Sequence, residues 1–150
     1  VDYPVNKKVI HKVVLPLFSE RTNDVQLKSG LNQWRADGRP RHHDEVYIPI
    51  PRRIHNENHG FFPARNTVFR LKTKDNQTMI GKVCQENDKA LMSNPNRDLG
   101  KWILRDKLKL EKQIAVTKEI LKQIRPVVLE KLALEVGTFW WKMAKLFFYH

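Results

Sequence analysis

Residues 67–84 read TVFRLKTKDNQTMIGKVC and contain two short segments in which apolar and polar side chains alternate. The segments are Thr67–Lys72 (TVFRLK) and Thr78–Cys84 (TMIGKVC). Alternation with a period of two is typical of a strand that buries one face. The linker carries Asp75 and Asn76, which favour tight turns. This stretch therefore predicts a β-hairpin.

Two further strands are predicted before the hairpin. Val9–Phe18 (VIHKVVLPLF) is rich in β-branched residues, and its proline indicates a sheet edge or a bulge. Glu45–Ile50 (EVYIPI) alternates until Pro51 stops it. Between these strands, Ser19–Asp44 is polar and interrupted by glycine and proline, so we expect an exposed loop system there.

The last third of the chain favours helices. Leu99–Leu110 spaces its apolar residues at a helical period, although its end could equally begin a strand. Thr117–Gly137 has a helix-like apolar face with Pro126 as a kink, and Val127–His150 also favours helix. Residues 119–150 are the part whose structure the pattern fixes least. Strands followed by a few helical segments predict a mainly β (α+β) or barrel-type fold.

Chain length and composition indicate the number of domains and the class of binding partner. The chain has 150 residues, which fits one domain over residues 1–150. Lys and Arg number 28 against 16 Asp and Glu, for a net charge of +12. Such a charge repels itself and is usually balanced by a polyanion, either nucleic acid or an acidic membrane surface. A basic protein without such a partner is the plain alternative.

The single cysteine, Cys84, cannot form an internal disulfide, which fits a reducing compartment. No run of about 18 apolar residues is present to span a bilayer. The chain starts with Val and not Met, so we expect a piece of a longer intracellular protein.

A search for catalytic patterns is negative. His55 and His59 lie four residues apart, but the Glu that a zinc-protease helix needs after the first His is missing. His42–Glu45 (HHDE) offers metal-ligand types, yet we expect adjacent side chains to point apart. Phosphate-binding glycine loops and nucleophile elbows are also missing. We therefore predict a non-catalytic domain without a metal or cofactor; an enzyme with an unrecognised site is the alternative.

Two polar segments carry the groups that read base edges. Arg matches guanine, Asn and Gln match adenine, and Asp accepts from cytosine. The first segment supplies Asn32, Gln33, Trp34, Arg35, Asp37, Arg39 and Arg41, and the second supplies Lys89, Ser93, Asn94, Asn96 and Arg97. Phosphate contacts are expected from Lys28, Arg52, Arg53, Arg65, Lys72, Lys74 and Lys101. Basic loops that contact phosphates without discrimination are the alternative for both segments.

Several spaced motifs resemble one family, the C-terminal recognition domain of NgoFVII-type restriction endonucleases. The upstream motifs are residues 29–34 (SGLNQW), 38–51 (GRPRHHDEVYIPIP) and 61–63 (FFP). The downstream motifs are residues 69–73 (FRLKT), 83–85 (VCQ), 89–95 (KALMSNP) and 99–102 (LGKW). The resemblance covers about residues 15–110.

The resemblance implies a B3-like fold: a seven-stranded open pseudobarrel with short helices near its ends and DNA held in a concave face. It implies two arms that enter the major groove, a first arm at Asn32–Arg41 and a second arm at Asn87–Arg97. It also implies a separate phospholipase-D-like nuclease domain earlier in the polypeptide, a bacterial cytoplasmic location and, in a restriction complex, further subunits. The family closes with more strands, from which the helical pattern of Val127–His150 departs.

The sequence thus predicts sequence-specific binding of double-stranded DNA by two arms, as the target-recognition domain of a type II restriction endonuclease. A transcription-regulator domain of the same fold and a nonspecific nucleic-acid binder are the alternatives. The prediction requires that the arms face the same way and that their charged tips are free of internal pairs. Replacing Arg39 by Ala should then cost on the order of 1–3 kcal/mol at one base position, whereas replacing Lys74 should weaken all DNA alike.

Overall fold

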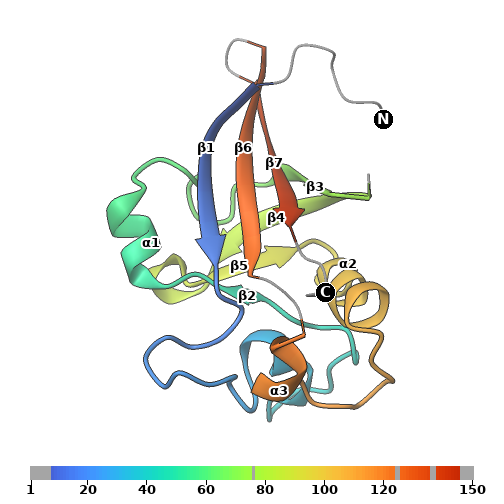
Figure 1. Cartoon of the computed structure of the whole chain (residues 1–150). Coiled ribbons are helices and arrows are strands. Elements are labelled where there is room, and N and C mark those ends of the chain that lie inside the picture. Colours follow the sequence, from blue (N-terminus) through green and yellow to red (C-terminus); the bar gives the residue numbers. More distant parts are fainter. Residues whose placement is uncertain (1–7, 76, 124–125, 136–137, 146–150) are drawn as a thin grey trace.

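The computed structural model describes residues 8–75, 77–123, 126–135 and 138–145, and its centre is a seven-stranded sheet (Figure 1). The strands are β1 (Lys8–Leu15), β2 (Ile48–Pro49), β3 (Phe69–Thr73), β4 (Thr78–Cys84), β5 (Ala90–Ser93), β6 (Val127–Glu135) and β7 (Thr138–Lys145). Their order is β1-β6-β7-β3-β4-β5-β2. Strands β3 and β7 are parallel, and the other neighbours are antiparallel. In this order β1 and β2 form the two edges, which confirms the expected mainly β, open pseudobarrel.

The helices are short and surround the sheet. They are α1 (Arg52–Glu57), α2 (Arg97–Gly100), α3 (Lys118–Leu121), the 3-10 helices η1 (Gly30–Arg35) and η2 (Glu86–Asp88), and the π-helix η3 (Lys101–Lys107). Helices this short depend on tertiary packing for their stability. Segment α2–η3 agrees with the helical interpretation of Leu99–Leu110, and its Trp102 and Ile103 are fully buried.

The predicted hairpin is present. Strand β4 has the bounds that the sequence predicted, and β3 begins two residues later than predicted. The Thr73 N–H donates to the Gln77 carbonyl at 2.9 Å and closes the turn. Asn76 lies outside the described residues. A Cβ atom at Gly81 would lie 2.9 Å from the ring of Phe69, which pairs with it across the strands, so glycine leaves room for the ring.

The segment between the first two strands differs from the prediction. Only Ile48–Pro49 of the predicted strand Glu45–Ile50 pairs, with β5. Ser19–Asp44 is not wholly exposed, since Asn32 is 1% exposed inside it. Its side-chain amide donates to the Val116 carbonyl at 2.9 Å and accepts from the Val116 N–H at 2.8 Å. The expectation of an exposed loop throughout is wrong because this amide anchors η1 to a distant part of the chain.

The helical interpretation of the C-terminal part is wrong. Residues 127–135 and 138–145 are strands β6 and β7, and β6 lies between β1 and β7. Both Trp140 and Trp141 are 5% exposed, so neighbouring positions of β7 are covered on both faces of the sheet. A strand buried on both faces loses its polar alternation. Gly137, which was expected to end a helix, lies outside the described residues.

Gly100 fixes how α2 packs on the chain before β2. A Cβ atom at this position would lie 1.7 Å from the backbone oxygen of Asp44. The carboxylate Oδ1 of Asp44 also accepts from Arg105 Nε of η3 at 2.9 Å. Backbone contact and ion pair together hold residue 44 against the helical segment.

Candidate nucleic-acid interface

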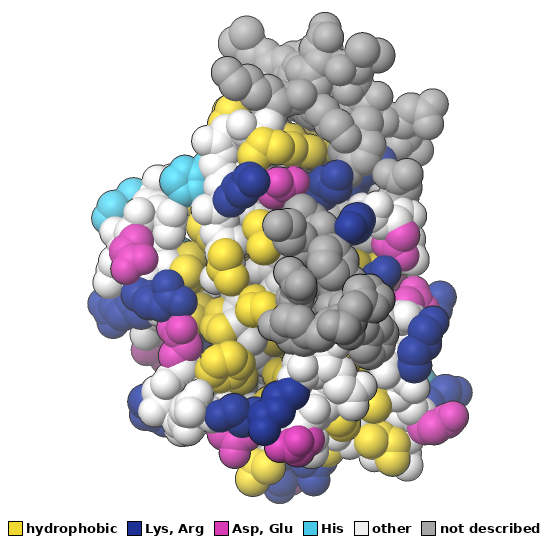
Figure 2. Space-filling view, in the orientation of Figure 1, with side chains coloured by type: hydrophobic (Ala, Val, Ile, Leu, Met, Phe, Trp, Pro, Cys, Tyr) yellow, Lys and Arg dark blue, Asp and Glu magenta, His cyan; other side chains and the backbone are white. Residues whose placement is uncertain are grey.

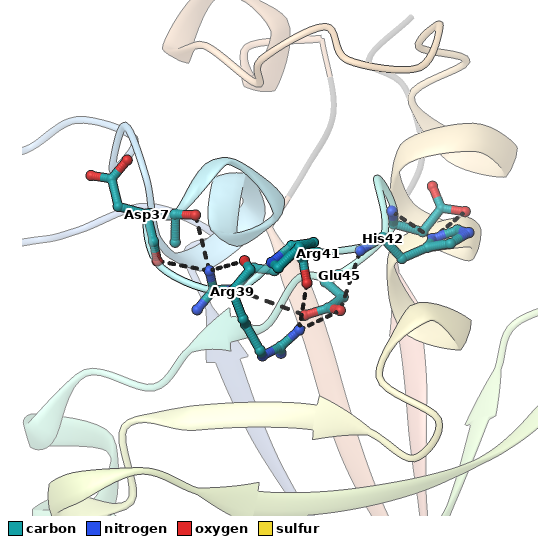
Figure 3. Close-up of polar contacts among 8 residues, drawn as sticks. Asp37, Arg39, Arg41, His42 and Glu45 are labelled. Atoms are coloured by element: carbon teal, nitrogen blue, oxygen red, sulfur yellow. Dashed lines mark hydrogen bonds and ion pairs between the residues drawn. The ribbon is translucent and has the colours of Figure 1, made fainter.

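The charged side chains at the tip of the predicted first arm form hydrogen bonds with other residues of the same loop (Figure 3). Arg39 donates from Nη1 and Nη2 to the two carboxylate oxygens of Glu45, at 3.1 and 2.8 Å. Arg41 Nη1 donates to the carbonyl oxygens of Ala36 and Asp37, both at 2.9 Å. The hydrogen bonds from Arg39 lower the pKa of Glu45, a residue that is 6% exposed. We call residues 36–45 the paired loop.

Neighbouring residues of the first arm have internal partners as well. Arg35 Nη1 donates to the Leu27 carbonyl at 3.0 Å, and Lys28 Nζ lies 3.0 Å from Asp37 Oδ2. Trp34 packs against the core, and Gln33 is half-buried. The expectation that the charged tips of this arm are free is therefore wrong in this structure.

The predicted second arm is divided by β5. Lys89 precedes this strand, and Asn94, Asn96 and Arg97 follow it. Four residues of strand span roughly 13 Å, so the two groups lie at opposite ends. Ser93 is 1% exposed, and its hydroxyl donates to the Pro95 carbonyl and accepts from the Leu99 N–H, both at 2.8 Å. Ser93 thus connects β5 to α2 and cannot reach a base in this conformation.

A cleft of about 800 Å³ lies between the loop after β1 and the start of α1. Its wall on the loop side is formed by residues 18–22 and 24–27, and its other wall includes Arg52, Arg53 and Lys89. Buried Tyr47 and Ile50 contribute to its apolar part. In Figure 1 the loop after β1 lies on the same side of the molecule as α1, and Figure 2 shows Lys and Arg side chains gathered over α1.

A second hollow of about 480 Å³ adjoins the cleft at Arg52, which lines both. Its other lining residues include His55, Arg65, Asn87 and Asp88. The turn between β4 and β5, residues 85–89, thus contributes Lys89 to the cleft and Asn87 and Asp88 to the hollow.

Several cations of the cleft have no partner among the residues that the structure describes. Arg21, Arg52 and Lys89 are exposed, and none has a side-chain hydrogen bond or ion pair with another residue in the described part of the chain. Arg53 instead donates from Nε and Nη2 to Glu20, both at 2.8 Å, which lowers the pKa of that carboxyl. A cleft with free guanidinium and ammonium groups favours a polyanionic ligand.

The sequence interpretation missed Arg21 and Thr22, which line the cleft wall. They lie in the run Arg21-Thr22-Asn23-Asp24, and Asn23 has a φ of 54°. Asn in the left-handed region is typical of a turn. A short polar turn directly after an edge strand was the signal available in the sequence.

The remaining predicted phosphate contacts lie away from the cleft. Lys72 is 2% exposed, and its Nζ lies 5.1 Å from the centroid of the Trp140 ring, so the expectation of a phosphate contact is wrong for this conformation. Lys74 is exposed beyond the end of β3, and Lys101 is exposed at the start of η3. Neither lines the cleft or the hollow.

His42, His43 and Asp44 come together, contrary to the expectation that adjacent side chains point apart. The two imidazole centroids are 4.0 Å apart, and the candidate ligand atoms of the three residues lie within 4.8 Å of one another. The Asp44 N–H donates to His42 Nδ1 at 3.1 Å, and the Arg105 guanidinium already binds the Asp44 carboxylate. Burial lowers the pKa of His43. The adjacent guanidinium opposes a second cation, so we assign this cluster to the scaffold.

Comparison with known proteins identifies the family. The open seven-stranded sheet with a basic cleft defines a β-domain suited to a polyanionic ligand. A family model described as the NgoFVII C-terminal B3-like DNA-binding domain matches residues 7–125, and the chain belongs to this family. Strands β6 and β7 lie beyond the match and complete the sheet. No curated protein matches the chain.

This chain is thus a B3-like DNA-binding domain of a restriction-enzyme family, and the resemblance in the sequence is confirmed. Within the described residues, helices that are long and apolar enough to cross a membrane are absent.

Proposed function

We propose that the cleft binds double-stranded DNA sequence-specifically, as the target-recognition part of a type II restriction endonuclease. The observation that carries this proposal is a group of cations without a partner in the described part of the chain, Arg21, Arg52 and Lys89, around one cleft in a domain of a DNA-binding family. Cleavage then belongs to a nuclease domain elsewhere in the polypeptide, in a bacterial cytoplasm, with or without further subunits.

The two arms that enter the major groove are reassigned in this proposal. The first arm is the loop of residues 18–27, with Arg21 and Thr22, and not Asn32–Arg41. The second arm is the turn of residues 85–89, with Asn87 and Lys89. The major groove is about 12 Å wide and admits such narrow elements. Arg52 at the start of α1 is retained as a phosphate contact, whereas Arg53, which already binds Glu20, is not.

Selection from a randomised duplex pool tests the proposal. We expect enrichment of one short site, whose affinity falls with salt because phosphate contacts release counterions. Replacing Arg52 by Ala should weaken selected and random duplexes alike and reduce the salt slope by about 0.9, the contribution of one phosphate. Recovery of the pool without enrichment would contradict sequence-specific binding.

Incubation with plasmid DNA and magnesium tests the assignment of cleavage to another domain. We expect the selected site to be bound and left intact. Cleavage activity that remains after purification to homogeneity and elutes together with the protein would contradict the assignment.

A further inference from the structure

The turn between β4 and β5 has an unusual backbone. Gln85, Asn87 and Asp88 have φ angles of 68°, 62° and 54°, in the left-handed region, and none of them is glycine. L-residues other than Asn and Asp rarely adopt this conformation, so Gln85 is the most strained of the three. Such a backbone persists where surrounding contacts over-determine it, and it is concentrated at ligand-binding sites.

The contacts that fix this turn converge on Asp88. Arg65 Nε donates to the Asp88 carboxylate at 2.6 Å, and the Nε2 atom of His55 lies 2.7 Å from the Asp88 carbonyl oxygen. The Asp88 N–H donates to the Gln85 carbonyl at 3.0 Å. One residue farther on, the Lys89 carbonyl accepts from the Ile50 N–H at 2.8 Å. The turn is thus tied to α1, to the loop before β3 and to Ile50 between β2 and α1.

Asp88 places a negative charge on the hollow beside the basic cleft, and this charge needs an explanation. A carboxylate beside a cleft that binds DNA repels phosphates. Its ion pair with Arg65 is half-exposed, with side chains 50% and 40% accessible, and such pairs add little to global stability. A local role, the fixing of the strained turn, accounts for the carboxylate where a contribution to global stability or a contact with phosphate does not.

We propose that Arg65 and His55 are positioning residues that act through Asp88 and hold Asn87 and Lys89 in the orientation that reads DNA. The predicted effect on DNA binding rests on the proposed function. The proposal also replaces the expectation that Arg65 contacts phosphate. Its structural part, the fixing of residues 85–89, holds in the protein without DNA.

The structural part is tested by NMR on the free protein. Arg65→Gln and Asp88→Asn should both move the Cα chemical shifts of Gln85, Asn87 and Asp88 and speed hydrogen exchange of the Asp88 amide. Asn tolerates the left-handed region, so the second variant removes the charge without adding backbone strain. Arg65→Lys should restore part of the exchange protection. Unchanged shifts and exchange in both variants would overturn the proposal.

The functional part is tested on the selected duplex and on random duplex. Asp88→Asn removes a negative charge, so an electrostatic effect alone would tighten binding to both. Positioning predicts the opposite for the selected duplex, a loss of about tenfold, equivalent to about 1.4 kcal/mol. The double variant Arg65→Gln/Asp88→Asn should bind no more weakly than Arg65→Gln, because both act on one turn. Asp98→Asn, which removes an exposed carboxylate from α2, is the matched control.

The outcomes separate the two proposals. Tighter binding by Asp88→Asn, with equal losses on both duplexes for Arg65→Gln, would make Arg65 a phosphate contact and overturn positioning. A wild-type protein that selects no site would contradict the proposed function, and the NMR result on the free protein would still decide whether Arg65 positions the turn.

Discussion

The paired loop and the cleft carry the same residue types, and they use them differently. Arg39 and Arg41 of the paired loop donate to Glu45 and to backbone carbonyls. Arg52 and Lys89 of the cleft have no such partner in the described residues. Composition therefore does not distinguish an arginine of the scaffold from one whose guanidinium is available to a ligand. The acceptors within reach of each guanidinium distinguish them.

The largest effect is expected where the paired loop meets α2. Gly100→Ala places a Cβ atom 1.7 Å from the Asp44 carbonyl oxygen, and backbone atoms must move to relieve the contact. We expect a loss of about 3 kcal/mol in the free energy of unfolding, measured with urea. Gly38→Ala is the control, because its Cβ meets nothing within 4 Å at a φ of 101°, and it should cost about 1 kcal/mol. Equal losses in the free energy of unfolding for the two variants would mean that the paired loop can move away from residue 100 at little cost and is not a fixed part of the scaffold.

The next effect compares Lys89 with Arg39 directly. Lys89→Ala should weaken binding of the selected duplex about tenfold, or about 1.4 kcal/mol, because a free ammonium of the cleft is lost. Arg39→Ala should leave the affinity of the folded protein unchanged, because its guanidinium already binds Glu45. Fluorescence anisotropy titrations on both variants measure this. A folded Arg39→Ala protein that loses its site would return base reading to the first arm as the sequence predicted it.

A smaller effect concerns pH. The hydrogen bonds from Arg39 lower the pKa of Glu45 from 4.5, so the folded state binds fewer protons at this group than the unfolded state. The stability that the carboxylate contributes is therefore present above pH 4.5 and is lost as the pH falls toward the lower folded pKa. Urea unfolding at a series of acidic pH values should show a shallower decline for Glu45→Gln than for the wild type.

Glu20, which lines the cleft and pairs with Arg53, allows the same measurement on an ion pair outside the paired loop. Arg53 also lowers its pKa, so Glu20→Gln should change the decline in the same direction. The side chain of Glu20 is 36% exposed against 8% for Glu45, and solvent screens the exposed pair more strongly. If Glu20→Gln changed the decline of stability with pH more than Glu45→Gln does, the Arg39–Glu45 pair would not be the stronger of the two ion pairs.

No effect on DNA binding is expected from Arg97→Ala. Arg97 begins α2, at the end of β5 opposite Lys89, and it lines neither the cleft nor the hollow. Its anisotropy titration should superimpose on that of the wild type. A clear loss would show that the second arm extends along β5 to the residues first predicted.

The sequence predicted the fold where one face of a strand is buried. Strand β4 alternates cleanly, and its predicted bounds are those of the structure. Strand β6 does not alternate, because Leu129 and Leu132 are three positions apart in a continuously paired stretch, lie on opposite faces of the sheet and are both buried. Spacings of three in an apolar segment imitate a helix. The error arose because an interior strand that is buried on both faces shows no alternation with a period of two in its sequence.

The site was predicted in part. Arg52, Arg53 and Lys89 line the cleft; the sequence predicted the two arginines as phosphate contacts and Lys89 as a base contact of the second arm. Asn32 and Arg39 were selected by residue type alone, and the structure gives them internal partners that lie far along the chain or in a tight loop. Base-reading groups and loop-fixing groups are chemically the same donors and acceptors. Only the three-dimensional positions of their partners separate them.

The position of β6 beside β1 has a consequence for how the chain reaches its native state. Val13 pairs with Leu129, so β1 cannot complete its hydrogen bonds with β6 until residues 16–135, which follow it in the chain, have been synthesised. Pairings so distant along the chain are associated with slow folding, since the entropy of loop closure must be overcome first. Until then β1 keeps Val9, Ile10 and His11 on an open strand, and nascent chains at high concentration can pair through it. Slow synthesis at low temperature should therefore favour the native sheet over aggregates.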